Sequence, residues 1–508
     1  MPESNRNLKP LTQYQKLLLA LAILAGCAFA LKTLSSMHLT GLWNDELATV
    51  EKSFQPSFSA LMDQLRNDVH PPLYYVILWG LGKVYGQTAT FLRSFSWVSY
   101  IIGAGLLGFA SWSWSRSGAA VVLALLLALA LPFTVTYAVE GKAYAFLYAL
   151  ICAASLFRIR LLARYGQAAY GYSLSWCFAA LTHYYGMGLL LCQIVLDLRA
   201  RRDTVKPLAW ALLAPTLWML INLGYLSGSE GRRWLRPAGS WLLEDTLTRL
   251  FGVNWLLIVL VLGVLVWALW HFSQKRGEVP ILGLVTDWGL DAGALLFLLT
   301  FLVSLVKPSS FPRHYIVLVP SLVGVFSCWV GVKLQDYSYQ RSRFAVVAIA
   351  MTVILATFWV DSFRWIVPTS QAADRYANDF RTLAMLGSQT QFKFSPQCIK
   401  LNLYDHVLRQ ERLIDPSASW GCLTERDQLP TTLSESVLRA ALPGQQQVFL
   451  AVTSTDVHGA RPIEPYVAEL EKRGLQCVPE PRNTKFMKAF HCGVKPIEAI
   501  SNDQKGNP

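Results

Sequence analysis

Long apolar runs dominate the first 368 residues of the chain. Runs of roughly 20 apolar residues are long enough to cross a bilayer as helices, and eleven of them are centred near residues 25, 103, 127, 150, 176, 190, 217, 261, 298, 324 and 352. This pattern predicts a polytopic α-helical membrane domain over residues 1–368 with about 11 transmembrane helices. Two long stretches are left outside the bilayer, about residues 37–92 and residues 369–508.

The first outer stretch, residues 37–92, has helical periodicity of its own. Apolar side chains recur on one face of a helix while Asp63, Gln64 and Arg66 face away, and those apolar residues are Phe54, Phe58, Leu61, Met62 and Leu65. This spacing is typical of a helix that lies on the membrane surface. Residues 73–86 are apolar but short and contain Lys83, so we expect a juxtamembrane or re-entrant segment there.

The last 140 residues have the pattern of a soluble domain. Val448–Val452 and Phe486–Cys492 read as strands, and Pro465–Arg473 reads as a helix. We therefore expect a small α/β domain over residues 369–508.

Composition supports a membrane protein and excludes a nucleic-acid partner. The chain is 53% hydrophobic and 15% charged with a mean hydropathy of +0.35, whereas soluble proteins carry about 25% charge. The net charge is +13, but residues 371–508 hold 16 basic and 15 acidic residues, so nearly all the excess lies in the apolar part. Basic residues that flank apolar spans indicate membrane orientation rather than a polyanion partner.

The basic residues also set the orientation of the chain. With a cytoplasmic N-terminus, 16 of the 29 basic residues before Gln371 fall in inner loops, in clusters such as Arg158, Arg160 and Arg164. Cytoplasmic loops are enriched in Lys and Arg. We therefore expect the N-terminus inside and residues 369–508 outside the cytoplasm. Disulfides are permitted there, and we expect the pairs Cys398–Cys422 and Cys477–Cys492.

The polar residues with chemical potential gather on the outer side of this topology. They are Asp45, Glu46, Asp68, His70, Glu140, Lys142, His183, Arg313 and His314, together with an Arg- and Trp-rich loop that holds Arg232, Arg233, Trp234, Arg236 and Trp241. Taken singly, each has an ordinary interpretation as a solvated loop residue. Ion-coupled transporters place charges near the bilayer midplane, whereas acids and bases at one rim suit an enzyme whose substrate has a lipid tail.

Four ordered patterns resemble the GT-C superfamily of polytopic glycosyltransferases, especially the protein O-mannosyltransferase (glycosyltransferase family 39) and lipid A aminoarabinose transferase families. Residues 45–46 resemble the acidic pair of the first loop, and residues 68–75 resemble a His-Pro-Pro-Leu segment. Residues 137–144 resemble a Glu-Ala-Arg-Met-Tyr motif, with Lys142 where Arg is usual, and residues 312–315 resemble a late Arg-Tyr motif.

The resemblance implies an inner-membrane hexosyl- or pentosyltransferase that uses a polyprenyl-phosphate-linked sugar. It implies that Asp45 is the general base for a lipid, glycan or protein acceptor. Acceptor- or sugar-positioning roles fall to Glu46, Asp68, Glu140 and Tyr144, and donor-phosphate roles fall to His70, Lys142, His183, Arg313, His314 and Tyr315. Glu46 and Glu140 would hold a divalent ion (Mg, Mn or Ca) if one is used. Two alternatives stay open: a transporter or flippase of lipid-linked saccharide, and a non-catalytic membrane scaffold.

Overall fold

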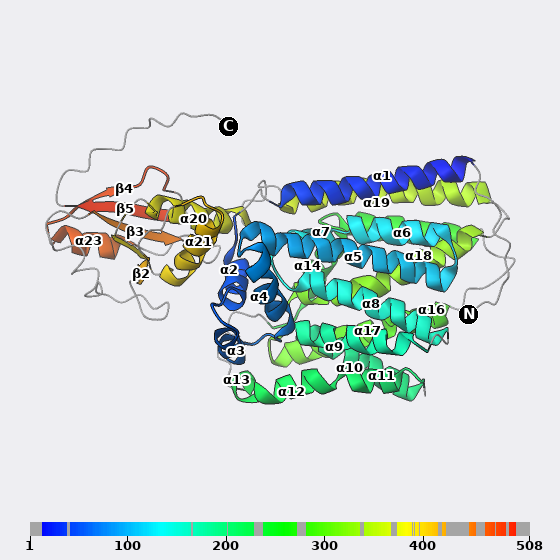
Figure 1. Ribbon diagram of the computed structural model, residues 1–508. Coiled ribbons are helices and arrows are strands. Elements are labelled where there is room, and N and C mark those ends of the chain that lie inside the picture. The colour runs from blue at the N-terminus through cyan, green and yellow to red at the C-terminus, as the bar shows by residue number, and fades with distance from the viewer. Residues whose placement is uncertain are drawn as a thin grey trace. The chain divides into compact units, whose positions relative to one another are not determined.

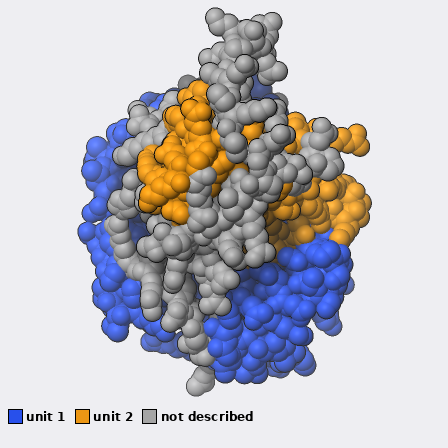
Figure 2. All heavy atoms as spheres, turned by 90° about the vertical axis from the view of Figure 1, so that its left-hand side faces the viewer, with its two compact units in different colours: residues 1–37, 55–80, 92–367 blue, residues 38–54, 81–91, 368–508 orange. Residues whose placement is uncertain are grey.

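The computed structural model divides the chain into two compact units (Figure 2). Unit 1 comprises residues 1–37, 55–80 and 92–367, and unit 2 comprises residues 38–54, 81–91 and 368–508. The residues described are 13–37, 41–163, 166–200, 202–227, 237–271, 281–335, 340–366, 373–388, 390, 392–395, 397–414, 419–422, 447–453, 463–472, 474–483 and 487–493. Arg232, Arg233, Trp234 and Arg236 of the predicted outer loop lie outside them.

Unit 1 is helical, and its long helices run side by side (Figure 1). All eleven predicted centres fall within helices, which are α1 (Gln13–Ser36), α5 (Ala89–Ser115), α6 (Gly118–Ala130), α8 (Tyr144–Leu162), α9 (Ala168–Thr182), α10 (Tyr184–Arg199), α12 (Leu213–Ile221), α15 (Trp255–His271), α17 (Leu290–Val306), α18 (Val319–Gln335) and α19 (Gln340–Ile366). The chain is a multi-pass membrane protein.

Several of these spans are short or bent. Within the described residues, four helices are long and apolar enough to cross a membrane unbroken, and the number rises to seven when each bent pair counts as one span. The bent pairs are α6 with α7 (Pro132–Ala138), α14 (Ser240–Phe251) with α15, and α16 (Ile281–Asp287) with α17. Hydropathy gives the places of the spans but not these breaks, so the predicted count of eleven exceeds the number that passes the length test.

The bend between α14 and α15 has a local cause. Gly252 has φ +84°, a left-handed conformation that glycine adopts without strain. A Cβ at this position would lie 2.2 Å from Oδ2 of Asp361, a buried residue of α19. That carboxylate accepts a hydrogen bond from the side-chain amide of Asn254, so a polar contact holds the start of α15 where the span bends.

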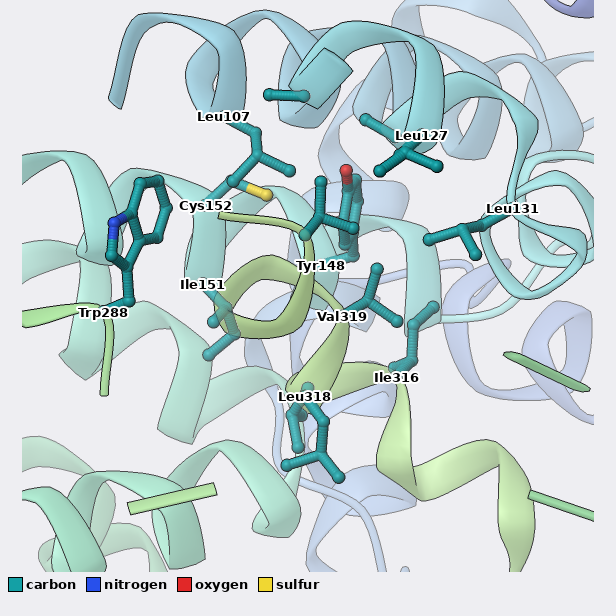
Figure 3. Packing of buried hydrophobic residues seen from close by; sticks show 14 of the residues in the cluster. Leu107, Leu127, Leu131, Tyr148, Ile151, Cys152, Trp288, Ile316, Leu318 and Val319 are labelled. Carbon is teal, nitrogen blue, oxygen red and sulfur yellow. The ribbon is translucent and has the colours of Figure 1, made fainter. Parts of the chain in front are cut away.

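The core of unit 1 is made of interdigitating aliphatic and aromatic side chains. Figure 3 shows Leu107 of α5, Leu127 of α6 and Tyr148 of α8 around the segment Ile316–Val319. Helices α5 and α8 approach closely at Gly103, where a Cβ would lie 2.5 Å from the Tyr148 ring. This packing fixes α5 and α8 against each other.

The first outer stretch folds into short helices. These are α2 (Asn44–Ser53), α3 (Phe58–Arg66) and α4 (Leu73–Tyr85). In α3, which belongs to unit 1, Leu61 and Leu65 are fully buried while Asp63 and Arg66 are exposed, as the periodicity predicts. Helix α4 has 13 residues, about 20 Å at 1.5 Å per residue, which is too short to cross a bilayer.

Unit 2 contains a mixed sheet, whose described strands lie in the order β2-β1-β3-β5-β4. The strands are β1 (Phe392–Ser395), β2 (Gly421–Cys422), β3 (Val448–Thr453), β4 (Gln476–Pro479) and β5 (Met487–Gly493). The described helices of the C-terminal region are α20 (Ala373–Gly387), α21 (Cys398–Gln410) and α23 (Glu464–Lys472). The predicted strands and helix of the α/β domain are present, although Arg473 and Phe486 lie outside the described residues.

The division into two units agrees only in part with the domain boundary expected from the sequence. The expected boundary at residues 368–369 lies within one residue of the break at 367–368. Residues 38–54 and 81–91 nevertheless group with the C-terminal region, whereas the sequence assigns them to the membrane domain. Contacts that are distant in sequence cause this difference, because α2 packs on α21.

Cysteine pairing is visible in unit 2. Cys477 and Cys492 are direct neighbours across the antiparallel β4–β5 pair and form a disulfide, which is the pair named from the sequence. Cys398 is also disulfide-bonded, while the side chain of its expected partner, Cys422, lies outside the described part of the chain. Five cysteines are free among the described residues, and all of them belong to the membrane unit.

Candidate active site

The expected base, Asp45, stands at the start of α2 in unit 2. Trp43 is the N-cap of this helix, and the carboxylate of Glu46 accepts the backbone N–H of Trp43 at 3.2 Å. Asp45 is half-buried and lies in the first helical turn, where the helix dipole favours a negative charge. The structure thus gives Glu46 a capping contact and leaves Asp45 as the partly accessible carboxylate of the pair.

The His-Pro-Pro segment of unit 1 holds an oriented histidine. Oδ1 of Asp68 accepts both the backbone N–H of His70 at 2.8 Å and its ring Nδ1–H at 2.6 Å. Asp68 is buried and His70 is partly exposed. Asp68 therefore orients the His70 ring, a different task from the acceptor-positioning role that the resemblance implies.

Glu140 and Lys142 occupy the connection between α7 and α8. The backbone N–H of Lys142 donates to the Glu140 carbonyl at 2.7 Å, and the hydroxyl of Ser96 donates to the same oxygen at 2.7 Å. Lys142 is 7% exposed. The tight turn thus places a buried ammonium group at one end of the helix bundle, where a nearby anion would offset its desolvation.

His183 lies between α9 and α10 and caps the second helix. Its Nδ1 accepts the backbone N–H of Tyr185 at 3.1 Å, so the hydrogen of the neutral ring is on Nε2. Burial, together with the charges of His70, Arg313 and Lys142, lowers the pKa of His183 to about 3. At neutral pH His183 is therefore an uncharged N–H donor, and the donor-phosphate role that the resemblance implies for it stays a prediction.

The last motif begins the 3-10 helix η2 (Pro312–Leu318). His314 repeats the arrangement of His183, since its Nδ1 accepts the backbone N–H of Phe311 at 3.2 Å. The guanidinium of Arg313 lies over the rings of Phe311 and Tyr144, with its Cζ 4.7 Å and 5.9 Å from their centroids. Cation–π contacts of this kind hold the planar group in place.

These segments meet within unit 1 although they are far apart in sequence. The rings of His183 and His314 are 5.1 Å apart, and Tyr144 lies 5.6 Å from His183. Electrostatic interactions also join His183 to His70, Lys142 and Arg313. Five of the six residues expected to bind the donor phosphate thus form one cluster, which we call the outer basic cluster: His70, Lys142, His183, Arg313 and His314.

Tyr315, the sixth expected phosphate ligand, is part of the core instead. It is fully buried, and its hydroxyl lies 3.0 Å from Oγ1 of Thr300. Its ring packs against Phe297 and Tyr185 at centroid distances of 4.7 Å and 5.6 Å. We therefore assign Tyr315 a packing role beneath the outer basic cluster.

Arg249, a basic residue of α14, belongs to none of the four sequence motifs. Its guanidinium donates to the hydroxyl of Tyr137 at 3.0 Å and lies over the Phe311 ring at 5.8 Å. Asp245, one turn earlier, pairs with it at 3.2 Å. Arg249 also interacts electrostatically with Arg313 and His314, so α14 contributes a further cation beside the outer basic cluster. A basic residue on a helix that follows an outer loop is the only sequence signal for it.

A protein site for a metal ion needs several ligand side chains close together. Among them, no group of three or more His, Cys, Asp or Glu side chains is arranged to hold a metal ion. Glu46 accepts the N–H of Trp43 in unit 2, while Glu140 belongs to unit 1. A divalent ion at Glu46 or Glu140 stays a prediction.

Comparison of the sequence with protein families and with curated proteins finds no match. The structure is similar to that of ArnT from Cupriavidus metallidurans, a lipid A aminoarabinose transferase, in the apo state, with a TM-score of 0.57 and 14% identity over 94% of this chain and 97% of ArnT. ArnT bound to undecaprenyl phosphate gives a TM-score of 0.56 and 14% identity over 95% and 98% of the two chains. The chain therefore has the fold of ArnT, which is a GT-C enzyme. This confirms the fold that the four ordered motifs predicted.

Proposed function

We propose that this chain transfers a sugar from a polyprenyl-phosphate carrier to a hydroxyl acceptor at the outer face of a bacterial inner membrane. The observation that carries the proposal is the outer basic cluster. It gathers two basic side chains, Lys142 and Arg313, and two Nε2–H donors, His183 and His314, in a partly buried place. Arg249 adds charge at its edge.

This set of donors is suited to a phosphate leaving group. When the bond between the anomeric carbon and the phosphate oxygen breaks, the carrier changes from a phosphodiester to a phosphomonoester with more negative charge. Fixed cations and N–H donors bind the product charge more strongly than the substrate charge, so they lower the barrier. A phosphate departs without protonation, so the site requires no general acid.

The other half of the reaction requires a base. In the proposal, Asp45 accepts the proton of the acceptor hydroxyl while the hydroxyl oxygen forms the new bond to the anomeric carbon. The electrons of the broken C–O bond leave with the phosphate, and the anomeric configuration inverts. The half-buried position of Asp45 in the first turn of α2 supports this role, because a base must be ionised and accessible.

The structural neighbours support the identity of the carrier. One of them contains undecaprenyl phosphate, a lipid whose chain lies in the bilayer and whose charged head lies at its surface. A carrier of this class fits the protein in both respects. The protein crosses the membrane in which the lipid chain lies, and its cations lie at helix ends, where the charged head group of the lipid can reach them. The acceptor and the sugar are left open by this reasoning.

The direct experiment supplies the purified protein with a panel of polyprenyl-phosphate sugars and a membrane extract, and detects products by mass spectrometry. We expect a new glycosylated product with the wild type and with Asp63→Asn, a control at an exposed carboxylate of α3. We expect Asp45→Asn to form this product about 10²- to 10⁴-fold more slowly. Failure of a folded wild-type sample to consume any donor would overturn the proposal and favour a transporter or a scaffold.

A further inference from the structure

Helix α21 of the C-terminal region contacts both segments of the first outer stretch that belong to unit 2. The hydroxyl of Tyr404 accepts the backbone N–H of Leu42 at 2.8 Å, and both residues are buried. Helix α2, which begins two residues after Leu42 and carries Asp45, packs on α21. The loop before the proposed base is thus anchored by a residue 362 positions later in the chain.

The same helix contacts the second segment, residues 81–91. Nε2 of His406 lies 2.9 Å from Oε1 of Gln87. The carboxylate of Glu411, at the end of α21, accepts the backbone N–H of Ala89 at 3.0 Å. Helix α21 therefore makes side-chain contacts with both segments, and two of these contacts engage backbone N–H groups.

Helix α21 is itself firmly attached to the sheet. Its Asp405 forms a fully buried ion pair with Lys393 of β1 at 2.5 Å. The Trp420 ring lies over this ammonium group at 5.1 Å, and Asn402 of α21 holds the backbone N–H of Trp420 at 2.8 Å. Removing one member of a buried ion pair is strongly destabilising, so this pair fixes α21 against β1.

We infer that Tyr404 is a positioning residue for Asp45, and that the C-terminal domain serves to hold the loop 41–43, which precedes the helix that carries Asp45. The inference rests on the proposed role of Asp45. The loop 41–43 has no regular secondary structure, and its described backbone contacts include the Tyr404 bond to Leu42. Catalysis requires the base to be placed accurately, since small displacements of a reacting group lower the rate steeply.

The test compares Tyr404→Phe with Tyr466→Phe, which removes another buried tyrosine hydroxyl of the same unit in α23. We expect Tyr404→Phe to lower kcat about tenfold while the Kd for undecaprenyl phosphate stays within twofold. We expect Tyr466→Phe to leave both values within twofold. A kcat for Tyr404→Phe equal to that of the wild type would overturn the inference.

A double-mutant cycle separates positioning of Asp45 from a general loss of structure. If Tyr404 acts through Asp45, then Tyr404→Phe lowers the residual rate of Asp45→Asn no further, because coupled residues are not additive. Additive effects would contradict the inference. Full activity of Asp45→Asn would instead overturn the proposed function, so the two failures differ.

A measurement on the wild type covers the case in which Tyr404→Phe does not fold. Hydrogen–deuterium exchange should show a protected amide at Leu42, because its N–H is bonded and buried. Exchange of that amide at the rate of an unstructured peptide would overturn the inference.

Discussion

His183 and His314 lie with their ring centroids 5.1 Å apart, and each imidazole accepts a backbone N–H through Nδ1. The hydrogen-bond network therefore assigns the hydrogen to Nε2 in each neutral ring. Both rings are donors whose orientation is set by the start of a helix. In the proposed function, phosphate recognition by this cluster combines neutral N–H groups with the charges of Lys142 and Arg313.

The first prediction concerns stability in acid. The folded pKa of His183 is about 3, against an ordinary value of about 6.5, so below pH 6.5 the unfolded state binds a proton that the folded state does not. The contribution of His183 to stability is therefore complete above pH 6.5 and is lost progressively as the pH drops from 6.5 toward 3.

His183→Asn tests this, because asparagine keeps the helix cap but does not titrate. Thermal unfolding in detergent between pH 7 and pH 4 should show a smaller loss of stability for the variant than for the wild type. Equal losses would show that His183 titrates normally.

The second prediction concerns the phosphate. Charge-assisted hydrogen bonds contribute about 1.5–3 kcal/mol, so Arg313→Ala should weaken undecaprenyl phosphate binding about 10- to 100-fold. Arg313→Lys should recover only part of the loss, since Lys lacks the planar fork that stacks on Phe311. Lys307→Ala, an exposed lysine of the same loop, is the control. Unchanged binding by Arg313→Ala in a titration calorimeter would contradict this role.

The sequence predicts the helices and the outer motifs well because hydropathy and local spacing determine them. His70 and Asp68 are two residues apart, so their pairing is a local matter. Arg249 and Tyr137 are 112 residues apart, and nothing in either segment encodes their contact. The grouping of Asp45 with the C-terminal unit is missed for the same reason, because it depends on the packing of α2 on α21, which is distant in sequence.

The third prediction concerns Arg158, which the pattern of basic residues places in an inner loop. The structure instead buries it in a bidentate pair with Asp197, at 2.6 Å and 2.9 Å. Asp197→Ala should lower the free energy of unfolding by about 3–5 kcal/mol because it leaves a buried charge without its partner.

Asp203→Ala, at an exposed carboxylate in the turn after α10, is the matched control and should have little effect. Combining Asp197→Leu with Arg158→Met should restore most of the stability lost in Asp197→Ala. Thermal unfolding in detergent measures all of these variants, and an Asp197→Ala transition equal to that of the wild type would refute the pairing.

The fourth prediction concerns the β4–β5 disulfide. Cys477 and Cys492 are separated by 15 residues, and closing a loop of that size stabilises a fold by about 3 kcal/mol. Replacing both with serine should lower the unfolding temperature of the C-terminal domain, while Cys177→Ser, at a free cysteine, should not. Thiol labelling of Cys477 in the unreduced wild type would show that the bond is absent.

The central claim is that the protein is a transferase with Asp45 as its base. Detergent micelles remove the bilayer, so a transporter has nothing to cross, and a transferase still forms product. With a donor from the panel and its acceptor in micelles, we expect the wild type to release one polyprenyl phosphate per acceptor glycosylated. Asp45→Asn should bind the donor equally but react about 10²- to 10⁴-fold more slowly. Equal product formation by Asp45→Asn would contradict the claim.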